Sequence, residues 1–150
     1  MKSKKLSHID EQGRPAMVDV SGKPPQVRRA RAMGRIRMQP ATVALIRNHR
    51  VAKGNVLTVA EIAGIQAAKR TSELIPLCHP LAVEKIEVRA VLESDAVQIE
   101  CEVVYTGKTG VEMEALTAVA VALLTVYDMC KAADQAMVLG EIKLLEKIKS

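Results

Sequence analysis

The chain has 150 residues, the size of one ordinary domain, and 49% of them are apolar, which is enough for a buried core. It contains no Phe, no Trp and only two Tyr, so aliphatic side chains and Met must fill that core. The three cysteines are far apart and form no CxxC pair, which argues against a disulfide framework and a zinc site. No segment resembles a signal peptide, and the most apolar stretch, 115–129, is too short to span a membrane. We therefore expect a cytoplasmic protein that does not bind a membrane.

The net charge of +5 is distributed unevenly along the chain. Residues 1–53 hold thirteen Lys and Arg against three acidic residues, whereas residues 54–150 hold nine against fourteen. Such asymmetry favours a polyanionic ligand, or attraction between surfaces of opposite charge. Nucleic acid is a poor candidate, because single strands bind through aromatic stacking platforms that this chain lacks. A small polyphosphate is the better partner.

The N-terminal arm, residues 1–26, is polar and rich in Gly and Pro, and we expect it to be mostly irregular with a short extended piece at 17–20. Residues 27–150 show no composition break and are expected to form a single α+β domain. Residues 29–38 alternate between apolar side chains and mostly Arg, which predicts a half-buried strand with a basic outer face. Pro40 then suits the first turn of a helix that continues to Asn48.

A second helix is predicted to begin near Thr58 and to end near Arg70, because Thr58 and Glu61 have the spacing of a capping box. Gly64 costs about 1 kcal/mol relative to Ala inside a helix, so we interpret it as permitting a tight crossing with a neighbouring element. Pro76 and Pro80 exclude a helix over the segment between them.

Two alternating runs, 86–92 and 97–103, are connected through the polar residues Glu93-Ser94-Asp95 and predict a β-hairpin. The loop 107–110 then opens a long apolar helix that is expected to end near Ala133, and a final strand over 137–145 precedes a Lys-rich tail. Hairpin-linked strands separated by helices favour an α+β fold, an antiparallel sheet with helices packed on one face.

The loop Gly107-Lys108-Thr109-Gly110 resembles the end of a P-loop, but Glu102 stands where a Walker motif needs its first Gly. We therefore reject a Walker motif. The loop still leads into a helix N-terminus, where free N–H groups and the helix dipole favour an anion. An ordinary tight turn explains the local pattern equally well. Glu112 and Glu114 follow in the first turn, where carboxylates suit the dipole.

Asp128 and Lys131 lie three residues apart near the other end of this helix and so share one face. The helix is apolar nearly all round, which predicts burial, and buried Asp and Lys are normally paired. The pair is either a structural salt bridge or an acid/base pair in which Lys131 lowers the pKa of Asp128. Glu114 and Asp128 are about 21 Å apart along the helix axis. A two-fold related subunit could bring its far end alongside, so we predict active sites shared between subunits.

The stiff segment Cys78-His79-Pro80 presents a single histidine. A lone His is more often structural, yet this one is well placed to reach a phosphate or a purine edge. No second His or carboxylate stands at metal-ligand spacing from it, so we expect no metal site. Lys53 and Lys69 add further cations, whose simplest interpretation is solvated charge.

Several long motifs together resemble the MoaC family, the cyclic pyranopterin monophosphate synthases of molybdenum cofactor biosynthesis. The resemblance extends from about Leu6 to Leu145 and is carried by these segments: Val18-Asp19-Val20, Ile62 to Thr71, Leu74 to Leu81, Thr106 to Leu116, and Tyr127 to Lys131. It implies a lyase that converts (8S)-3′,8-cyclo-7,8-dihydroguanosine 5′-triphosphate to cyclic pyranopterin monophosphate and diphosphate. It also implies a ferredoxin-like catalytic domain, and a hexamer arranged as a trimer of dimers with active sites at the dimer interface.

The resemblance also implies roles for single residues. Asp128, Lys131 and Lys53 take catalytic positions. Substrate-binding positions fall to the following residues: Leu77, Cys78, His79, Met113, Glu114, Glu112, Lys69, Asp19 and Arg28. We expect no resident cofactor, and leave open whether Mg²⁺ accompanies the triphosphate. The chain departs from many relatives in having Asn55 instead of Asp after Lys-Gly, and in lacking a Gly-Gly-Lys-Ser-Gly tail after Leu145, with its lysine.

The alternative from another functional class is a non-catalytic nucleotide- or RNA-binding module that uses the basic N-terminal half, with the arginine-faced strand as its surface. The scarcity of aromatic side chains and the Asp128/Lys131 pair count against it.

Overall fold

The computed structural model describes residues 7–150. The strands are β1 (Gln26–Arg37), β2 (Lys85–Leu92), β3 (Ala96–Gly107) and β4 (Val138–Lys149). The helices are α1 (Pro40–Arg47), α2 (Val56–Lys69), α3 (Thr71–Leu74) and α4 (Glu112–Cys130). All strand pairs are antiparallel, and the sheet order is β2-β3-β1-β4. This is the ferredoxin-like α+β arrangement that was predicted.

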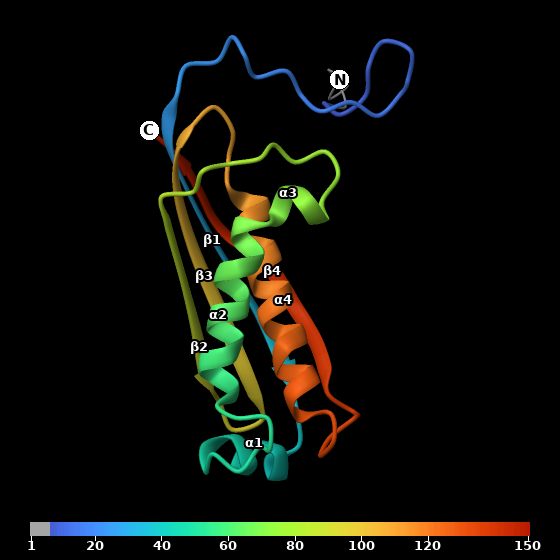
Figure 1. Ribbon diagram of the computed structural model, residues 1–150, viewed down its shortest axis with the longest axis vertical. Coiled ribbons are helices and arrows are strands. Elements are labelled where there is room, and N and C mark those ends of the chain that lie inside the picture. The colour runs from blue at the N-terminus through green and yellow to red at the C-terminus, as the bar shows by residue number, and fades with distance from the viewer. Residues whose placement is uncertain (1–6) are drawn as a thin grey trace.

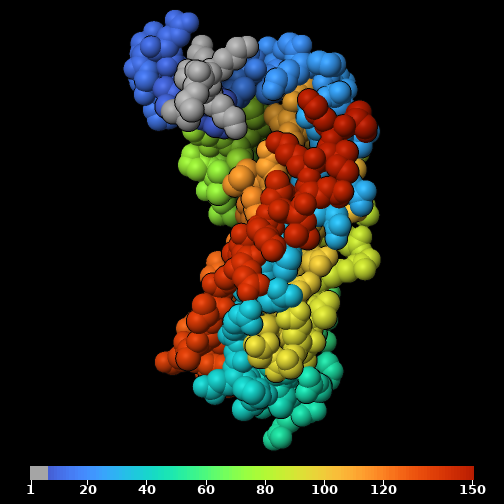
Figure 2. Space-filling view, turned by 180° about the vertical axis from the view of Figure 1, so that it is seen from behind, coloured from blue at the N-terminus to red at the C-terminus, as the bar shows by residue number. Residues whose placement is uncertain are grey.

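Helices α2 and α4 lie side by side on one face of the sheet, while α1 lies at one end of the molecule (Figure 1). Within residues 7–150 no helix covers the opposite face, and the atoms of its strands form the surface seen from behind (Figure 2). The core is the layer between the helices and the sheet. It contains the alternating side chains Ala30, Ala32 and Ile36 of β1, which are fully buried as the strand pattern predicts.

Gly64 and Gly34 allow the helices to approach their neighbours closely. A Cβ atom on Gly64 would lie 3.1 Å from the carbonyl oxygen of Ala118 in α4 and 3.1 Å from Cγ1 of Val88 in β2. A Cβ atom on Gly34 would lie 2.8 Å from Cγ1 of Val119. The tight crossing predicted at Gly64 is therefore confirmed, and β1 contains a second close approach, to α4.

The predicted capping box of α2 is wrong. The helix begins at Val56 and its cap is Asn55, whose side-chain oxygen accepts a hydrogen bond from the Thr58 N–H at 3.1 Å. Glu61 instead accepts a hydrogen bond from the backbone N–H of Ala90 in β2 at 3.0 Å. Since β2 is an edge strand, that N–H has no strand partner, and the carboxylate satisfies it. Asn55 therefore has a structural role as the N-cap of α2.

Other differences concern where elements end. Helix α4 ends at Cys130 and not near Ala133, and the short helix α3 was not predicted. Strand β4 continues through the predicted Lys-rich tail to Lys149, because these residues pair with the start of β1. No strand covers 17–20, and the part of the arm that the structure describes contains one isolated bridge, between Ile9 and Pro15.

Within residues 7–150, α4 alone has the length and hydropathy of a membrane-crossing helix. It lies in the core against β1 and β3, and a helix buried in a protein core is as apolar as one that crosses a membrane.

Candidate active site

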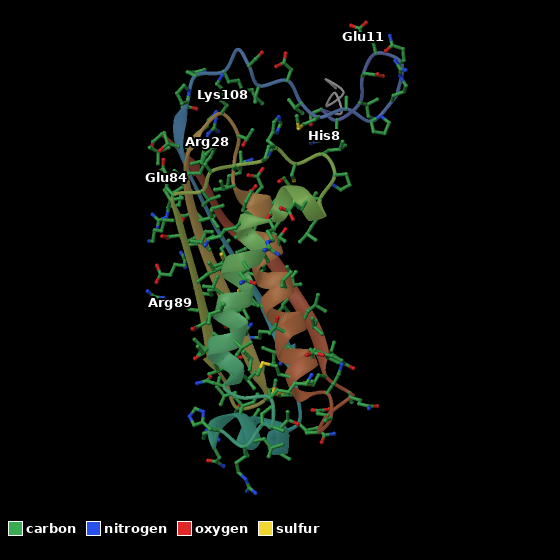
Figure 3. The ribbon with its side chains drawn as sticks, viewed as in Figure 1. His8, Glu11, Arg28, Glu84, Arg89 and Lys108 are labelled. Carbon is green, nitrogen blue, oxygen red and sulfur yellow. The ribbon has the colours of Figure 1, made fainter. Side chains whose placement is uncertain are left out.

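A hollow of about 570 Å³ lies at the end of the molecule where β3 passes into α4. Its walls come from the N-terminal arm, the first residues of β1, the loop 77–81, the segment 108–114 and the last residues of β4. Figure 3 shows Arg28, Lys108 and His8, all three among the lining residues, at this same end. Segments distant in sequence therefore meet here, and we refer to this hollow as the arm pocket.

The arm pocket gathers most of the residues to which the family resemblance gives a substrate-binding position. Its lining includes Arg28, Leu77, Cys78, His79, Glu112, Met113 and Glu114. Asp19 and Lys69 are not part of the lining. The Asp19 carboxylate accepts a hydrogen bond from the Ser21 N–H at 2.9 Å, which lowers its pKa, and Lys69 is exposed in the last turn of α2.

Four lysines that were not predicted as substrate-binding residues also line the arm pocket, and one of them, Lys108, belongs to the loop predicted to favour an anion. They are Lys23, Lys108, Lys147 and Lys149. The Lys108 Nζ donates to the Ser21 carbonyl oxygen at 2.8 Å, and the Lys147 Nζ donates to Glu112 Oε1 at 2.8 Å. The register of the sheet, which places Lys149 opposite Arg28, brings the end of β4 to the pocket. No local sequence motif predicts this pairing of β4 with β1.

His79 connects the loop of the pocket to the arm. Its Nε2 lies 2.6 Å from the carbonyl oxygen of Val18. A carbonyl oxygen only accepts, so this ring nitrogen carries the hydrogen and donates it. Nε2 therefore binds the arm, which is the structural role that a lone His has more often, and the predicted contact of this ring with a phosphate or a purine edge stays a prediction.

Glu114 is a buried acid in the wall of the arm pocket, with only 4% of its surface exposed. Burial raises its pKa to about 7, and the charge of nearby Glu112 acts in the same direction. Two neighbouring oxygens, Thr109 Oγ1 and Glu112 Oε2, are buried without a hydrogen-bond partner within the described part of the chain. The pKa of the Cys78 thiol is also raised, mainly by burial and to a smaller extent by the charges of Glu114 and Glu112. This wall therefore offers unsatisfied polar groups that a ligand could engage.

The three residues at predicted catalytic positions meet at the other end of α4. The Asp128 carboxylate contacts the Lys53 Nζ through Oδ2 and the Lys131 Nζ through Oδ1, each at 2.8 Å. The Lys53 Nζ also donates to the Asp128 carbonyl oxygen at 3.0 Å. Lys131 and then Lys53 lower the pKa of Asp128 to about 2, in the direction predicted for Lys131. In turn, the pKa of Lys131 is raised by Asp128. We refer to these three residues as the lysine–aspartate cluster.

The predicted burial of Asp128 and Lys131 is wrong for the single chain. Their side chains are 56% and 53% exposed, and that of Lys53 is 50% exposed. Asp128 lies in the last turn of α4 and Lys131 directly follows that helix, and within residues 7–150 both side chains remain about half exposed. The cluster is separated from Glu114 by fourteen residues of helix, about 21 Å along the axis. One chain therefore does not bring it to the arm pocket.

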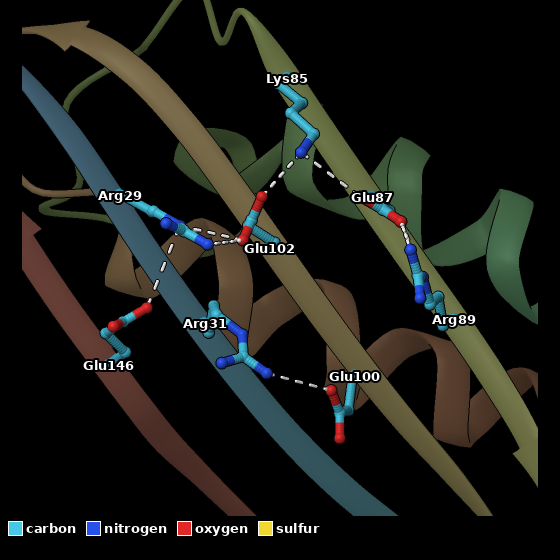
Figure 4. Close-up of polar contacts among 8 residues, drawn as sticks. All are labelled: Arg29, Arg31, Lys85, Glu87, Arg89, Glu100, Glu102 and Glu146. Carbon is cyan, nitrogen blue, oxygen red and sulfur yellow. Dashed lines mark hydrogen bonds and ion pairs between the residues drawn. The ribbon is translucent and has the colours of Figure 1, made fainter.

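The arginine-faced side of β1 is not a free basic surface. Arg29 pairs with Glu102 at 2.6 Å, Arg31 with Glu100 at 3.4 Å, and Arg35 with Glu93 at 2.9 Å. Figure 4 shows how Lys85, Glu87 and Arg89 of β2 extend this lattice of opposite charges across the sheet. The basic face expected from β1 alone is thus paired with acidic residues of β3 and of the turn that precedes it, which argues against its use for binding RNA.

Among residues 7–150, no three His, Cys, Asp or Glu side chains are arranged to hold a metal ion. Cys101 and Cys130 are buried, Cys78 is partly buried, and all three are free thiols.

Comparison with known proteins gives one consistent result. A sequence model of the MoaC family matches residues 17–150. The chain is 56% identical over 149 residues to the cyclic pyranopterin monophosphate synthase of Parvibaculum lavamentivorans, covering 98% of this chain and 93% of that protein. It is 54% identical to the protein of the same name from Desulfitobacterium hafniense, and 56% identical to that from Thermomicrobium roseum. These two matches each cover 95% of this chain, and 88% and 87% of the relatives. The chain belongs to the MoaC family.

Proposed function

We propose that this chain is a cyclic pyranopterin monophosphate synthase. It would act as a lyase of molybdenum cofactor biosynthesis on the cyclised GTP derivative named above and would release diphosphate. The observation that carries the proposal is the arm pocket, where cations from β1 and β4 face the carboxyl groups at the start of α4. The name shared by the relatives, which are more than half identical over almost the whole chain, supports the same activity.

The cations of the arm pocket suit a triphosphate. Arg28, Lys108, Lys147 and Lys149 surround one hollow, and none of the four is buried. Expulsion of diphosphate develops negative charge on the leaving oxygens, and cations already in place stabilise that charge without reorganising. Lys147 is held by Glu112, so the arriving phosphate would compete with one carboxylate for this cation.

The carboxyl wall suits the purine-derived ring. Glu114, with a pKa near 7, can accept a hydrogen bond when ionised and donate one when protonated. Thr109 Oγ1 and Glu112 Oε2 add two unpaired oxygens beside it. We propose that these groups bind the N–H donors of the ring, which orients the triphosphate toward the cations.

The lysine–aspartate cluster suits proton transfer. Opening a purine-derived ring and closing a cyclic phosphate both require protons to be moved. Asp128 remains ionised at neutral pH and keeps two ammonium groups within 2.8 Å of its oxygens. Lys53 and Lys131 are therefore the groups proposed to exchange protons with the substrate, and Asp128 the group that orients and charges them.

We propose that each active site combines the arm pocket of one subunit with the lysine–aspartate cluster of another. The two ends of α4 are too far apart to serve one small substrate in the same chain. A two-fold axis near the middle of α4 would bring each end beside the opposite end of the partner. Leu124 in this helix is 57% exposed, and Ile142 and Leu144 of β4 are 42% and 39% exposed, which is apolar surface that such a dimer could cover. Three dimers would form the hexamer that the family resemblance implies.

We further propose that the protein acts in the cytoplasm and binds neither nucleic acid nor membranes. It would need no resident cofactor, and any Mg²⁺ would enter with the triphosphate. The pairing of the sheet-face arginines with carboxylates supports the proposal that nucleic acid is not bound.

The direct test is incubation of the purified protein with the cyclised GTP derivative and measurement of the diphosphate released. We expect Lys131→Ala to lower kcat by about 10²–10⁴, the usual contribution of a positioned proton donor. Lys143→Ala is the matched control, because Lys143 is exposed on β4 and lies outside the arm pocket. Absence of diphosphate with the unaltered protein would refute the proposed function. Full activity of Lys131→Ala would refute only the role of that lysine.

A further inference from the structure

Asp134 is a buried carboxylate that the proposed chemistry does not use. It is 4% exposed and lies in the turn between α4 and β4. Its Oδ2 accepts hydrogen bonds from the Gln39 N–H at 3.0 Å and from the Thr42 hydroxyl at 3.1 Å, and its Oδ1 accepts one from the Ala136 N–H at 3.1 Å. The Gln39 N–H is the largest of the influences that keep the pKa of Asp134 below its usual range. A buried charge with three donors is fixed in position, because any displacement leaves it unsatisfied.

The donors come from a segment far from Asp134 in the sequence. Gln39 is the residue before α1, and Thr42, which is 2% exposed, lies in the first turn of that helix. The other end of α1 leads into the loop that carries Lys53. Figure 1 shows α1 at the same end of the molecule as the C-terminus of α4. The carboxylate therefore joins the segment that delivers Lys53 to the segment that delivers Lys131.

The Lys131 side of this connection is short and regular. The Lys131 N–H donates to the Tyr127 carbonyl oxygen at 2.9 Å, and the Asp134 N–H donates to the Cys130 carbonyl oxygen at 3.1 Å. The turn after α4 thus continues the hydrogen bonding of the helix end as far as Asp134. The position of Asp134 consequently fixes the direction in which the chain leaves Lys131.

Apolar packing also links the two segments, since Val43 and Ile46 of α1 are buried in the same core as Met129 and Cys130 of α4. Asp134 adds directional hydrogen bonds, which apolar packing does not supply.

The ion pairs of the lysine–aspartate cluster are about half exposed, and such pairs contribute little stability while the lysine side chains retain many rotamers. Between the segments lies a hollow of about 330 Å³, whose lining includes Leu45, Val51 and Met129. The side chains of the two segments therefore do not fill the space between them. Thr42, whose hydroxyl donates to Asp134, lines the same hollow.

We propose that Asp134 is a positioning residue, whose carboxylate ties α1 to the turn after α4 and so holds Lys53 and Lys131 on either side of Asp128. The expected effect of Asp134 on kcat rests on the proposed function, whereas its expected effect on the positions of the two lysines does not. Asp134 touches no reacting group in this proposal and acts only through the two lysines.

The test uses small changes at both ends of the connection. Thr42→Val removes the hydroxyl donor at nearly constant volume, and Thr42→Ser keeps it. Asp134→Asn replaces one acceptor oxygen with an amide NH₂ that would face a donor. Asp95→Asn is the matched control, because it removes an exposed carboxylate that pairs with Arg37. Two quantities are measured for each full-length variant: the pKa of the Asp128 carboxyl group by ¹³C NMR, and kcat and KM for diphosphate release.

We expect the pKa of Asp128 in Thr42→Val and Asp134→Asn to rise from about 2 toward its usual 3.8, because the two lysines no longer converge on it. We expect kcat to fall about tenfold with KM within about twofold, since misplaced catalytic groups slow the chemical step more than they weaken binding. Thr42→Ser, which keeps the hydroxyl donor, and the control Asp95→Asn should both leave the pKa of Asp128 and kcat at the values of the unaltered protein.

A merely structural role would lower the melting temperature of these variants while the pKa of Asp128 and the kcat of the folded protein stayed at their original values, and that result would overturn the proposal. If Asp134→Asn does not fold, the comparison of Thr42→Val with Thr42→Ser decides. If the unaltered protein releases no diphosphate, the proposed function fails, and the NMR measurement alone decides whether Asp134 positions the lysines.

Discussion

The two ends of α4 each carry a carboxyl group whose pKa departs from its usual value, and the two departures have opposite signs. Glu114 in the first turn is buried, and its pKa rises to about 7. Asp128 in the last turn is exposed between two lysines, and its pKa falls to about 2. The difference shows that the surroundings of each acid, and not its residue type, determine its charge at neutral pH.

The two ends of α4 are therefore suited to different functions. The arm pocket holds unpaired oxygens and several cations, as a binding site for a polar and charged molecule would. The lysine–aspartate cluster is already satisfied and charged in the absence of a ligand. The pocket end therefore offers groups suited to binding, and the other end offers the groups proposed to transfer protons. We propose that the two ends meet across a subunit interface.

The largest effect on stability is expected at Glu114. Its folded-state pKa of about 7 lies above the ordinary 4.5, so the folded protein binds this proton more tightly than the unfolded chain does. The free energy of unfolding should therefore fall as the pH rises from 4.5 to 7 and stay level above that. Glu114→Gln mimics the protonated form, and it should be more stable than the unaltered protein at pH 8 by up to about 3 kcal/mol.

Urea unfolding at pH 4.5 and pH 8, at one protein concentration, measures this difference. Glu73→Gln serves as the control because Glu73 is exposed, and it should change stability equally little at both pH values. A Glu114→Gln variant whose stability advantage did not grow with pH would show that Glu114 is not a buried acid, and the contrast between the two ends would disappear.

A smaller effect is expected for substrate binding at the pocket end. Lys147→Ala should raise KM for the triphosphate about tenfold, because it removes one cation and leaves the Glu112 carboxylate without its partner. The effect should shrink as the ionic strength increases, since salt screens charges near the surface. Lys143→Ala, on the same strand but outside the pocket, should leave KM unchanged. Equal KM values for the two variants would remove Lys147 from the phosphate site.

The smallest effect concerns the two lysines of the cluster. Lys131→Met should raise the pKa of Asp128 more than Lys53→Met does, because Lys131 is the larger of the two influences. We expect each change to be about one pH unit or less, as is usual for single exposed ion pairs. ¹³C NMR of the Asp128 carboxyl group measures both. The reverse order would mean that the loop carrying Lys53 holds Asp128 more strongly than its own helix does.

Patterns that repeat locally predicted most of the fold. The alternation in β1 and β3, the prolines around 76–80 and the Gly64 position in α2 each reflect a constraint within a few residues. The sequence therefore predicted the tight crossing at Gly64 and the order of all elements except the short helix α3. The cap of α2 was missed because Thr58 and Glu61 satisfy the capping-box pattern, while Asn55 three residues earlier makes the bond.

Properties that depend on distant pairing were not predictable. Lys147 and Lys149 reach the arm pocket because β4 pairs with β1 along its whole length, and nothing in the last residues shows where that strand ends. The exposure of Asp128 was missed because an apolar helix predicts burial on average. Asp128 lies on the exposed side of α4, four residues after the exposed Leu124, whereas Met129 and Cys130 in the same turn are buried. Asp134 carried no signal, since its partners Gln39 and Thr42 lie more than ninety residues earlier.

The most direct test of the two-ended site is complementation between inactive subunits. Asp128→Ala and Glu114→Ala variants, carrying different tags, are co-expressed, and oligomers containing both are purified by the two tags in turn. Each mixed dimer should contain one site with both changes and one with neither. If dimers within the hexamers assemble at random, about half of them are mixed, so about a quarter of all sites are intact and about a quarter of the original rate of diphosphate release should return. If mixed oligomers form but release diphosphate no faster than either variant alone, the two ends of α4 do not build one site across subunits.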